Sequence, residues 1–134
     1  MSTHFNDIQT ALDTQLATIS GSPAIAWEFV VTEPTGDYLR PTFLPGETIQ
    51  ACRGDDGQDY TTGIYQVDTF KIRGTGRSQY PDLIATLFKR GTYLTYNGVT
   101  IQIMAASIES SSAEENYMIT PVSIRWQVFT SPRV

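Results

Sequence analysis

A change of hydrophobic period near Gly21 most constrains how this chain of 134 residues can fold. Beyond Gly21 and Pro23 the period is two, as in the strand predicted from Ala24 to Val31. Before that point apolar residues recur three and four positions apart, which is the spacing of one face of an amphipathic helix: Phe5, Ile8, Leu12, Leu16 and Ile19. One opening helix followed by alternating segments predicts a sheet that buries one face beneath helices.

The dipeptide Asn97-Gly98 is the strongest turn signal in the chain, because both residues tolerate the positive φ of a type I′ hairpin. Pairing Tyr96 with Val99 then places Leu94 opposite Ile101, so one face of the hairpin stays apolar. This register predicts two antiparallel strands on either side of the turn.

A second, short helix is predicted over residues 80–88. Pro81 stands in its first turn, Asp82 lies beside its positive end, and Gly91 follows its close. Residues 63–70 and 122–128 read as strands, whereas the serine- and glutamate-rich stretch 107–116 is expected to be a solvated loop.

The segment from Ala24 to Leu44 is expected to form a hairpin centred near Pro34. In that register Glu28 lies opposite Arg40, where the two side chains would form a cross-strand ion pair of modest value. Pro41 removes a donor from any ladder and therefore places the second strand at a sheet edge or on an irregular arm.

The predicted fold is α+β: an antiparallel-rich mixed sheet of about six or seven strands with two helices packed on it. We expect a single domain over residues 1–134, because a chain of this size buries enough surface to hold a core without metals or disulfides. No apolar run approaches the ~18 residues of a membrane span, and the first residues lack a secretion signal, so a cytoplasmic origin is expected.

The residue types that carry most catalytic chemistry are nearly absent. His4 is the only histidine and lies near the N-terminus, and Cys52 is the only cysteine. No catalytic residue, metal site or cofactor site is therefore predicted. The glycines around Thr75 lack the remaining residues of a phosphate-binding loop. An alternative that the residues leave open is a small-molecule-binding or enzymatic α+β domain built around Glu28, Arg40 and Asp68.

Charge is distributed unevenly along the chain, which has 14 acidic and 9 basic side chains and a net charge of −5. Residues 1–60 carry 9 acidic and 2 basic groups, or −7, and the remainder carries 5 and 7, or +2. Unlike potentials on different faces favour head-to-tail contact between copies. The acidic balance also argues against general affinity for nucleic acid.

Four ordered blocks of sequence resemble the tail terminator (tail completion) proteins of long-tailed bacteriophages, in particular the lambda minor tail protein U group: Ala26-Trp27-Glu28, residues 38–45, residues 63–68 and residues 121–126. The resemblance implies a structural virion protein at the head-proximal end of the tail, assembled in the host cytoplasm. It implies a homo-oligomeric ring, typically a hexamer, that caps the tail tube protein, stops its polymerisation and meets the head–tail connector protein. A neighbouring neck or tail-tube subunit is the alternative within this class.

DNA would pass through such a ring without specific binding, which an acidic lumen would favour. For contacts between subunits or with partners we hypothesise the loop from Arg73 to Gln79 and the cations near it, because exposed arginines beside glycine turns can reach acidic neighbours. The predicted interface residues are Arg40, Lys71, Arg73, Arg77 and Gln79.

Overall fold

The computed structural model describes residues 5–21, 23–27, 36–50, 59–74, 76, 78–114 and 116–130, with the side chains of 47–50, 59–60 and 129–130 left aside. These residues form two helices and seven strands, which confirms the predicted α+β fold. The elements are α1 (Phe5–Leu16), β1 (Ala24–Ile25), β2 (Tyr38–Gln50), β3 (Asp59–Ile72), α2 (Tyr80–Leu87), β4 (Tyr93–Tyr96), β5 (Val99–Ile108), β6 (Ser112–Glu114) and β7 (Tyr117–Thr130). No helix among these residues is long and apolar enough to cross a membrane.

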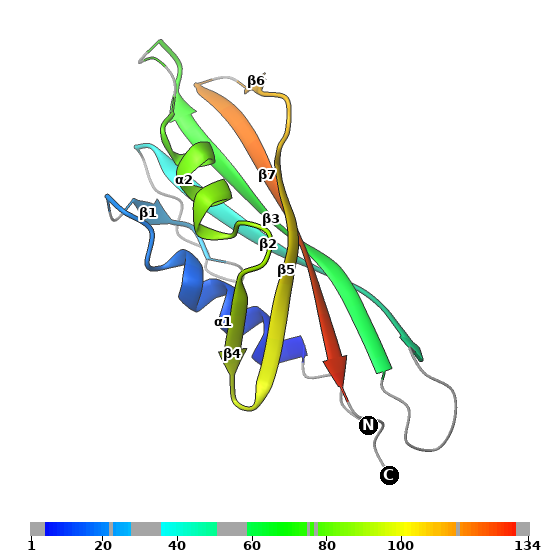
Figure 1. The fold of residues 1–134 in the computed structure, drawn as a ribbon. Helices are drawn as coiled ribbons and strands as arrows, with labels where there is room; N and C mark the ends of the chain where they lie inside the picture. The colour runs from blue at the N-terminus through cyan, green and yellow to red at the C-terminus, as the bar shows by residue number, and fades with distance from the viewer. Residues whose placement is uncertain are drawn as a thin grey trace.

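The sheet has the strand order β1-β2-β3-β7-β5-β4, and β6 pairs with β7 beyond the end of β5. The pairs are antiparallel apart from β1 with β2. Figure 1 shows α1 and α2 on the same side of this twisted sheet, while the far ends of β2 and β3 extend away from both helices. We call the two sides the helix face and the open face.

The main core lies between the helices and the helix face of the sheet. The predicted stripe of α1 is confirmed, since Ile8, Leu12 and Leu16 are fully buried. The alternation predicted for the last strand is also confirmed, with Val122, Ile124, Trp126 and Val128 buried in the same cluster. The helical period places the apolar residues of α1 on one stripe, and the period of two places those of β7 on one face of the sheet. The stripe and the face therefore pack against each other.

Two local predictions match the structure closely. Tyr96 pairs with Val99 and Leu94 with Ile101, around a turn in which Asn97 and Gly98 have φ values of 53° and 81°. The second helix begins with Pro81 in its first turn and ends at Leu87, with its buried side facing β5 and β7.

The predicted hairpin between the first two strands is wrong. Within the described residues β1 ends at Ile25 and runs parallel to β2, with Ala24 beside Tyr38 and Ile25 beside Leu39. The antiparallel partner of β2 is β3, which places Asp68 beside Arg40. A carboxylate from β3 therefore occupies the position next to Arg40 that the hairpin had given to Glu28, and Glu28 itself lies outside the described residues.

The predicted loop over residues 107–116 is also partly wrong. β5 continues to Ile108, and β6 follows along the same side of β7. Glu109 lies between β5 and β6 in the sequence, and its N–H donates to the Pro121 carbonyl of β7 at 2.8 Å. The residues are largely exposed, as expected, but their backbone bonds to β7 keep them in the sheet.

Candidate assembly surfaces

A second, smaller apolar cluster covers one end of the open face. Tyr38 and Phe70 stack with centroids 4.3 Å apart, Tyr117 meets both rings edge-on, and Ile119 completes the buried group. The Tyr117 hydroxyl donates to the Gly36 carbonyl at 3.3 Å. Apolar packing on both faces gives this end of the sheet a rigid base for the charged residues beside it.

Arg40 extends from this cluster over the open face. Its guanidinium lies 4.8 Å from the centre of the Phe70 ring and 3.2 Å from an Asp68 carboxylate oxygen. The Gln66 amide also donates to Asp68, at 2.9 Å. Asp68 is almost fully buried whereas about half of the Arg40 side chain is exposed. The arrangement holds the cation in place and still presents part of it to a partner.

Two of the hypothesised groupings meet different outcomes here. In the alternative set of Glu28, Arg40 and Asp68, the structure brings Arg40 and Asp68 together, and neither of these two lines any of the three hollows described below. The predicted ion pair between Glu28 and Arg40 stays a prediction, because Glu28 lies outside the described residues.

Lys71 lies on the helix face at the end of β3. Its ammonium is 3.0 Å from an Asp37 carboxylate oxygen, and the other oxygen accepts the Ile72 N–H at 2.9 Å. Burial alone would raise the pKa of the Asp37 carboxyl, but the Ile72 N–H and the Lys71 ammonium outweigh it and hold this pKa below its usual value. The ion pair ties the start of β2 to the end of β3.

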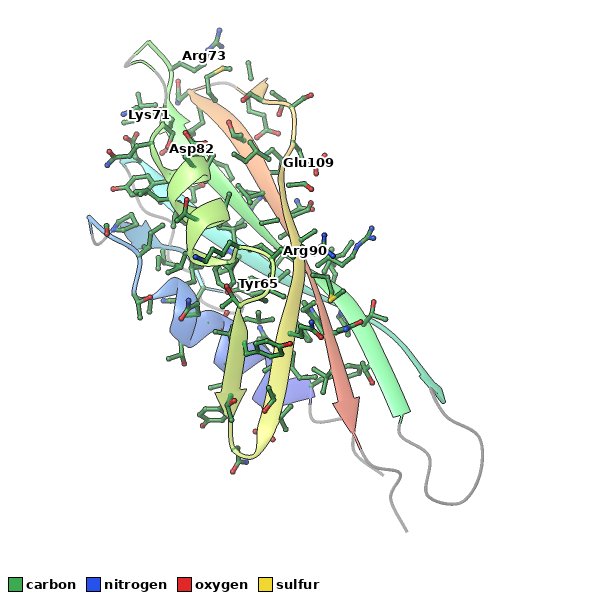
Figure 2. All side chains as sticks on the ribbon, viewed as in Figure 1. Tyr65, Lys71, Arg73, Asp82, Arg90 and Glu109 are labelled. Atoms are coloured by element: carbon green, nitrogen blue, oxygen red, sulfur yellow. The ribbon has the colours of Figure 1, made fainter. Side chains whose placement is uncertain are left out.

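The predicted contact loop follows directly. Arg73 is exposed and its N–H donates to the Asn116 carbonyl at 2.9 Å, while the Gly74 backbone has a φ of 84°. Gln79 is exposed and precedes α2, and Arg77 lies outside the described residues. Figure 2 shows Lys71 and Arg73 at the same end of the molecule. The structure therefore places Lys71 and Arg73 at one end of the molecule, Gln79 at the start of α2, and Arg40 on the opposite face of the sheet.

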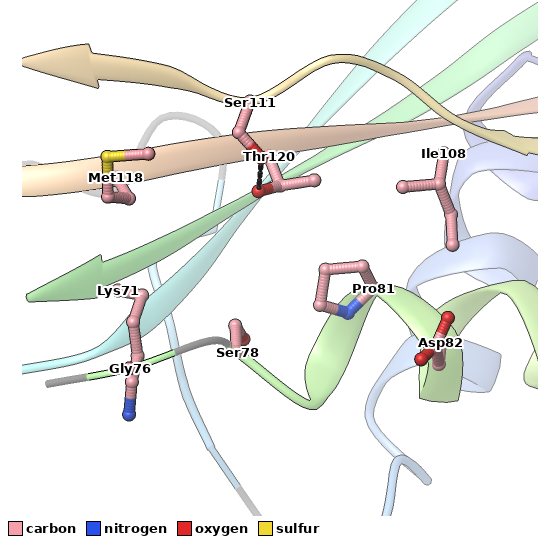
Figure 3. Close-up of a pocket in the computed structure, with 9 residues that line it drawn as sticks. All are labelled: Lys71, Gly76, Ser78, Pro81, Asp82, Ile108, Ser111, Met118 and Thr120. Carbon is pink, nitrogen blue, oxygen red and sulfur yellow. Dashed lines mark hydrogen bonds between the residues drawn. The ribbon is translucent and has the colours of Figure 1, made fainter.

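A cleft of about 390 Å³ lies between this loop and the sheet, and we call it the helix cleft. Figure 3 shows the start of α2 on one side and β5 and β7 on the other, with the Ser111 and Thr120 hydroxyls joined at 2.7 Å. Its lining combines aliphatic and polar side chains: Lys71, Gly76, Ser78, Pro81, Asp82, Ile108, Ser111, Met118 and Thr120.

A second hollow, of about 440 Å³, lies where β2 and β3 extend beyond the helices, and we call it the arm hollow. Two glycines shape it, because a Cβ on Gly46 would lie 2.2 Å from the Thr62 carbonyl oxygen and one on Gly63 would lie 2.4 Å from the Trp126 ring. The hollow is lined by Leu44, Pro45, Gly46, Thr62, Gly63, Ile64 and Arg125. A third, shallower hollow of about 300 Å³ lies beside α1 at Gln9, Asp13, Thr14, Ala17 and Trp27.

The outer edge of β2 carries two prolines in the positions that matter most for strand pairing. The Ala26 N–H donates to the Leu39 carbonyl at 2.8 Å, so the backbone N–H and carbonyl of Leu39 point away from β3. The β2–β3 register then runs without a shift to Pro45, so Pro41, Phe43 and Pro45 face outwards as well. Within the part of the chain that the structure describes, β1 pairs with the first of these positions, Leu39. Pro41 and Pro45 thus lack an N–H on the side of β2 that faces away from β3, so among the described residues this side has few donors for another strand.

The sequence, compared with models of known families, matches the model for phage tail terminator proteins over residues 7–126. The chain belongs to the phage tail terminator protein family. It is therefore a structural protein of the phage tail and a component of the virion.

The chain was also compared with solved structures and with curated proteins. A solved structure superposes on this terminator with a TM-score of 0.77, at 20% sequence identity, over 98% of this chain and 100% of its own. That likeness shows a shared fold. A search of curated proteins finds no match.

Sequence reasoning missed the aliphatic residues that this terminator exposes beside its hollows. Leu44 and Ile108 are each 45% exposed and Met118 is 36% exposed. The signal was present, since Leu44 and Met118 each adjoin an apolar residue of the opposite face, Phe43 and Ile119. Strict alternation fails at these positions, and that failure marks apolar side chains on both faces of the sheet.

Proposed function

We propose that this chain closes into a ring of six copies on the head-proximal end of the completed tail tube, stops tube polymerisation and offers its other surface to the head–tail connector protein. The family match over residues 7–126 carries the proposal. The unlike helix and open faces support it, because a subunit with two different contact surfaces associates head to tail. Residues 1–134 act as one domain in this proposal.

The mechanism is differential binding by two ring surfaces. One surface matches the last ring of tube subunits, and the opposite surface rejects further tube subunits and accepts the connector. If the rotation that relates neighbouring subunits closes after a whole number of copies, the subunits form a ring; if it does not close, they form a filament. Termination is then a property of geometry and surface chemistry, with no bond-making step.

The predicted interface residues take their places in this scheme. Lys71, at the end of β3, lines the helix cleft, and Arg73 and Gln79 flank the loop beside it, with Arg77 between them in sequence. Arg40 belongs to the open face. Two separate locations are what a head-to-tail contact requires. DNA passes through the ring without specific binding, and we expect negligible retardation of duplex DNA at micromolar protein and physiological salt.

The test uses the tail tube protein of the phage that encodes this chain. Tube protein polymerises with and without the purified chain, and negative-stain images give the distribution of tube lengths and the structure of the tube ends. We expect rings on tube ends and an arrest of growth. Incorporation of the chain along the tube would instead assign it as a tube subunit, and unchanged tube growth with bare ends would refute the proposal.

Charge reversal at Arg73 and Arg77 tests the loop. The variant with both residues changed to Glu is expected to lose capping, while a matched variant with Lys89 and Arg90 changed to Glu, on the exposed turn after α2, keeps it. Capping by the loop variant at the level of the unaltered chain would remove the loop from the interface.

A further inference from the structure

We propose that neighbouring subunits of the ring join through two surfaces of this chain, the arm hollow of one copy and the helix cleft of the next. The inference rests on the ring of the proposed function and names the contact that builds it. Three observations on the described residues lead to this contact: exposed aliphatic side chains at both hollows, opposite charges beside them, and their separation on the molecule.

Both hollows expose aliphatic side chains that the monomer leaves partly uncovered. Leu44 pairs with Ile64 across β2 and β3 on the open face, and Leu44 is 45% exposed. In the helix cleft Ile108 is 45% exposed and Met118 is 36% exposed. Exposed aliphatic groups within polar surroundings are characteristic of the centre of a protein interface.

The charges at the two hollows are complementary. Arg125 is exposed and, among the described side chains, is the charged one that lines the arm hollow. The helix cleft is lined by Asp82 and by Lys71, whose ammonium is paired with Asp37. Glu109 follows Ile108 at one edge of the cleft, and the loop that begins at Arg73 lies at the other. Figure 2 shows Asp82 and Glu109 at the same end of the molecule. Opposite charges around an apolar centre fix the register of a contact and disfavour pairing of like surfaces.

The two hollows lie far apart on the chain's surface and on opposite faces. Thr62 of the arm hollow is beside Gln127, whereas Ser111 of the helix cleft is beside Thr120, seven residues away along β7. At about 3.3 Å per residue this is a separation of about 23 Å. The hollows of one molecule cannot meet, so their complementarity is satisfied only between copies.

The contact is made by side chains on the two faces, and strand pairing along β2 does not contribute to it. Pro41 and Pro45 remove two outward N–H groups from the stretch of β2 that leads to the arm hollow, and the Phe43 N–H remains between them. Because strand pairing along this side of β2 is disfavoured, we expect a neighbouring copy to bind at the arm hollow.

Disulfide trapping tests the contact directly. The chain with Cys52 changed to Ala receives cysteines at Thr62 and Ser111, and oxidation is carried out on tubes that it caps. A disulfide requires Cα atoms within about 7 Å, so the two cysteines of one chain cannot react with each other. We expect a ladder of covalent oligomers on non-reducing gels. Chains with either cysteine alone, and a chain with cysteines at Thr95 and Ser111, are the controls and should stay monomeric.

A charge exchange gives the second measurement. Changing Arg125 to Glu should weaken ring formation at least tenfold, measured by the protein concentration needed to cap half of the tubes. Changing Asp82 and Glu109 to Arg should weaken it similarly, and combining the three changes should recover capping to within a few-fold of the unaltered chain. Circular dichroism confirms the folded state of each variant.

The outcomes separate this contact from the function. Capped tubes with no ladder, or full capping by the Arg125→Glu variant, would overturn the contact and leave the terminator function standing. Failure of the unaltered chain to cap would refute the proposed function itself. A ladder together with recovery by charge exchange would establish both.

Discussion

Gly63 offers a sharp test of how the sheet packs, because a single methyl group has no room there. A Cβ at this position would lie 2.4 Å from the Trp126 ring carbon Cζ2 and 2.6 Å from the Leu44 carbonyl oxygen. Trp126 is fully buried and stacks on Phe43 with centroids 5.5 Å apart, so its ring cannot move without disturbing the core. Gly63→Ala therefore forces either the indole or the β2 backbone to shift.

The expected cost of this substitution follows from overpacking. Inserted methyl groups in well-packed cores cost about 1–3 kcal/mol, and contact with backbone places Gly63→Ala near the upper end. The entropy of unfolding of a chain of this length is about 0.28 kcal/mol/K, so a cost of about 2.5 kcal/mol lowers Tm by about 9 °C. Thermal unfolding followed by circular dichroism measures the shift, and urea titration gives the free energy of unfolding independently.

Gly36 supplies the matched control. A Cβ there has no heavy atom within 4 Å outside its chain neighbours, and the backbone φ lies outside the positive range. Gly36→Ala should therefore change Tm by less than about 2 °C, within the range of neutral surface substitutions.

A double-mutant cycle tests the contact between residues 63 and 126. Trp126→Phe removes Cζ2, the closest side-chain atom, so the combination with Gly63→Ala should be less destabilised than the sum of the single variants by about 1 kcal/mol. A Gly63→Ala chain that melts within 2 °C of the unaltered protein, or strict additivity with Trp126→Phe, would refute the packing argument.

Two further predictions concern the edge of β2 and the ion pair at its start. Replacing Pro41 and Pro45 with Thr restores two outward N–H groups, so we expect faster aggregation or higher oligomers in light scattering; unchanged scattering would show that the prolines do not protect this edge. Because the pKa of Asp37 is lowered in the folded state, the stability from its bonds to Lys71 and Ile72 is present above the unfolded pKa and is lost as pH falls through the folded value. Asp37→Asn should therefore cost at most about 1 kcal/mol at pH 7, as measured by urea unfolding, and this cost should shrink as the pH is lowered through the folded pKa; a cost that does not change with pH would contradict the assignment.

The sequence was most informative where structure is local. The helix period of α1, Pro81 at the start of α2 and the Asn97-Gly98 turn each depend on residues a few positions apart, and each prediction was confirmed. The alternation of the last strand was equally clear because its partners bury one side of it throughout.

Partner choice between strands was harder to predict, because alternation fixes which face is buried but not which strand lies alongside. The parallel pairing of Ile25 with Leu39 arises from tertiary packing, and so does the position of Asp68 beside Arg40. Likewise, the backbone bonds that keep residues 112–114 in the sheet depend on β7 and leave no hydrophobic pattern in an exposed strand.

Candidate assembly surfaces were only partly visible in the sequence, for a physical reason. Charged residues could be selected by type, which led to Lys71 and Arg73, but a side chain's availability depends on its own partners in the fold. Lys71 is committed to Asp37, whereas Arg125 lies exposed in a hollow that only the tertiary structure creates. A charged residue chosen from the sequence alone is therefore a weaker indication of an interface than a charged residue that lies beside exposed apolar side chains in the structure.

Breaks in alternation are the more useful signal in a half-covered sheet. A strand whose open face meets only water needs apolar residues on one side, so adjacent apolar pairs are unnecessary for the monomer. Phe43 with Leu44 is such a pair, and Leu44 remains exposed at the arm hollow. Because exposure of large aliphatic groups promotes aggregation, keeping them there is explained if another copy covers them. In the proposed ring, a position that weakens the strand pattern is thus one that a neighbouring copy would cover.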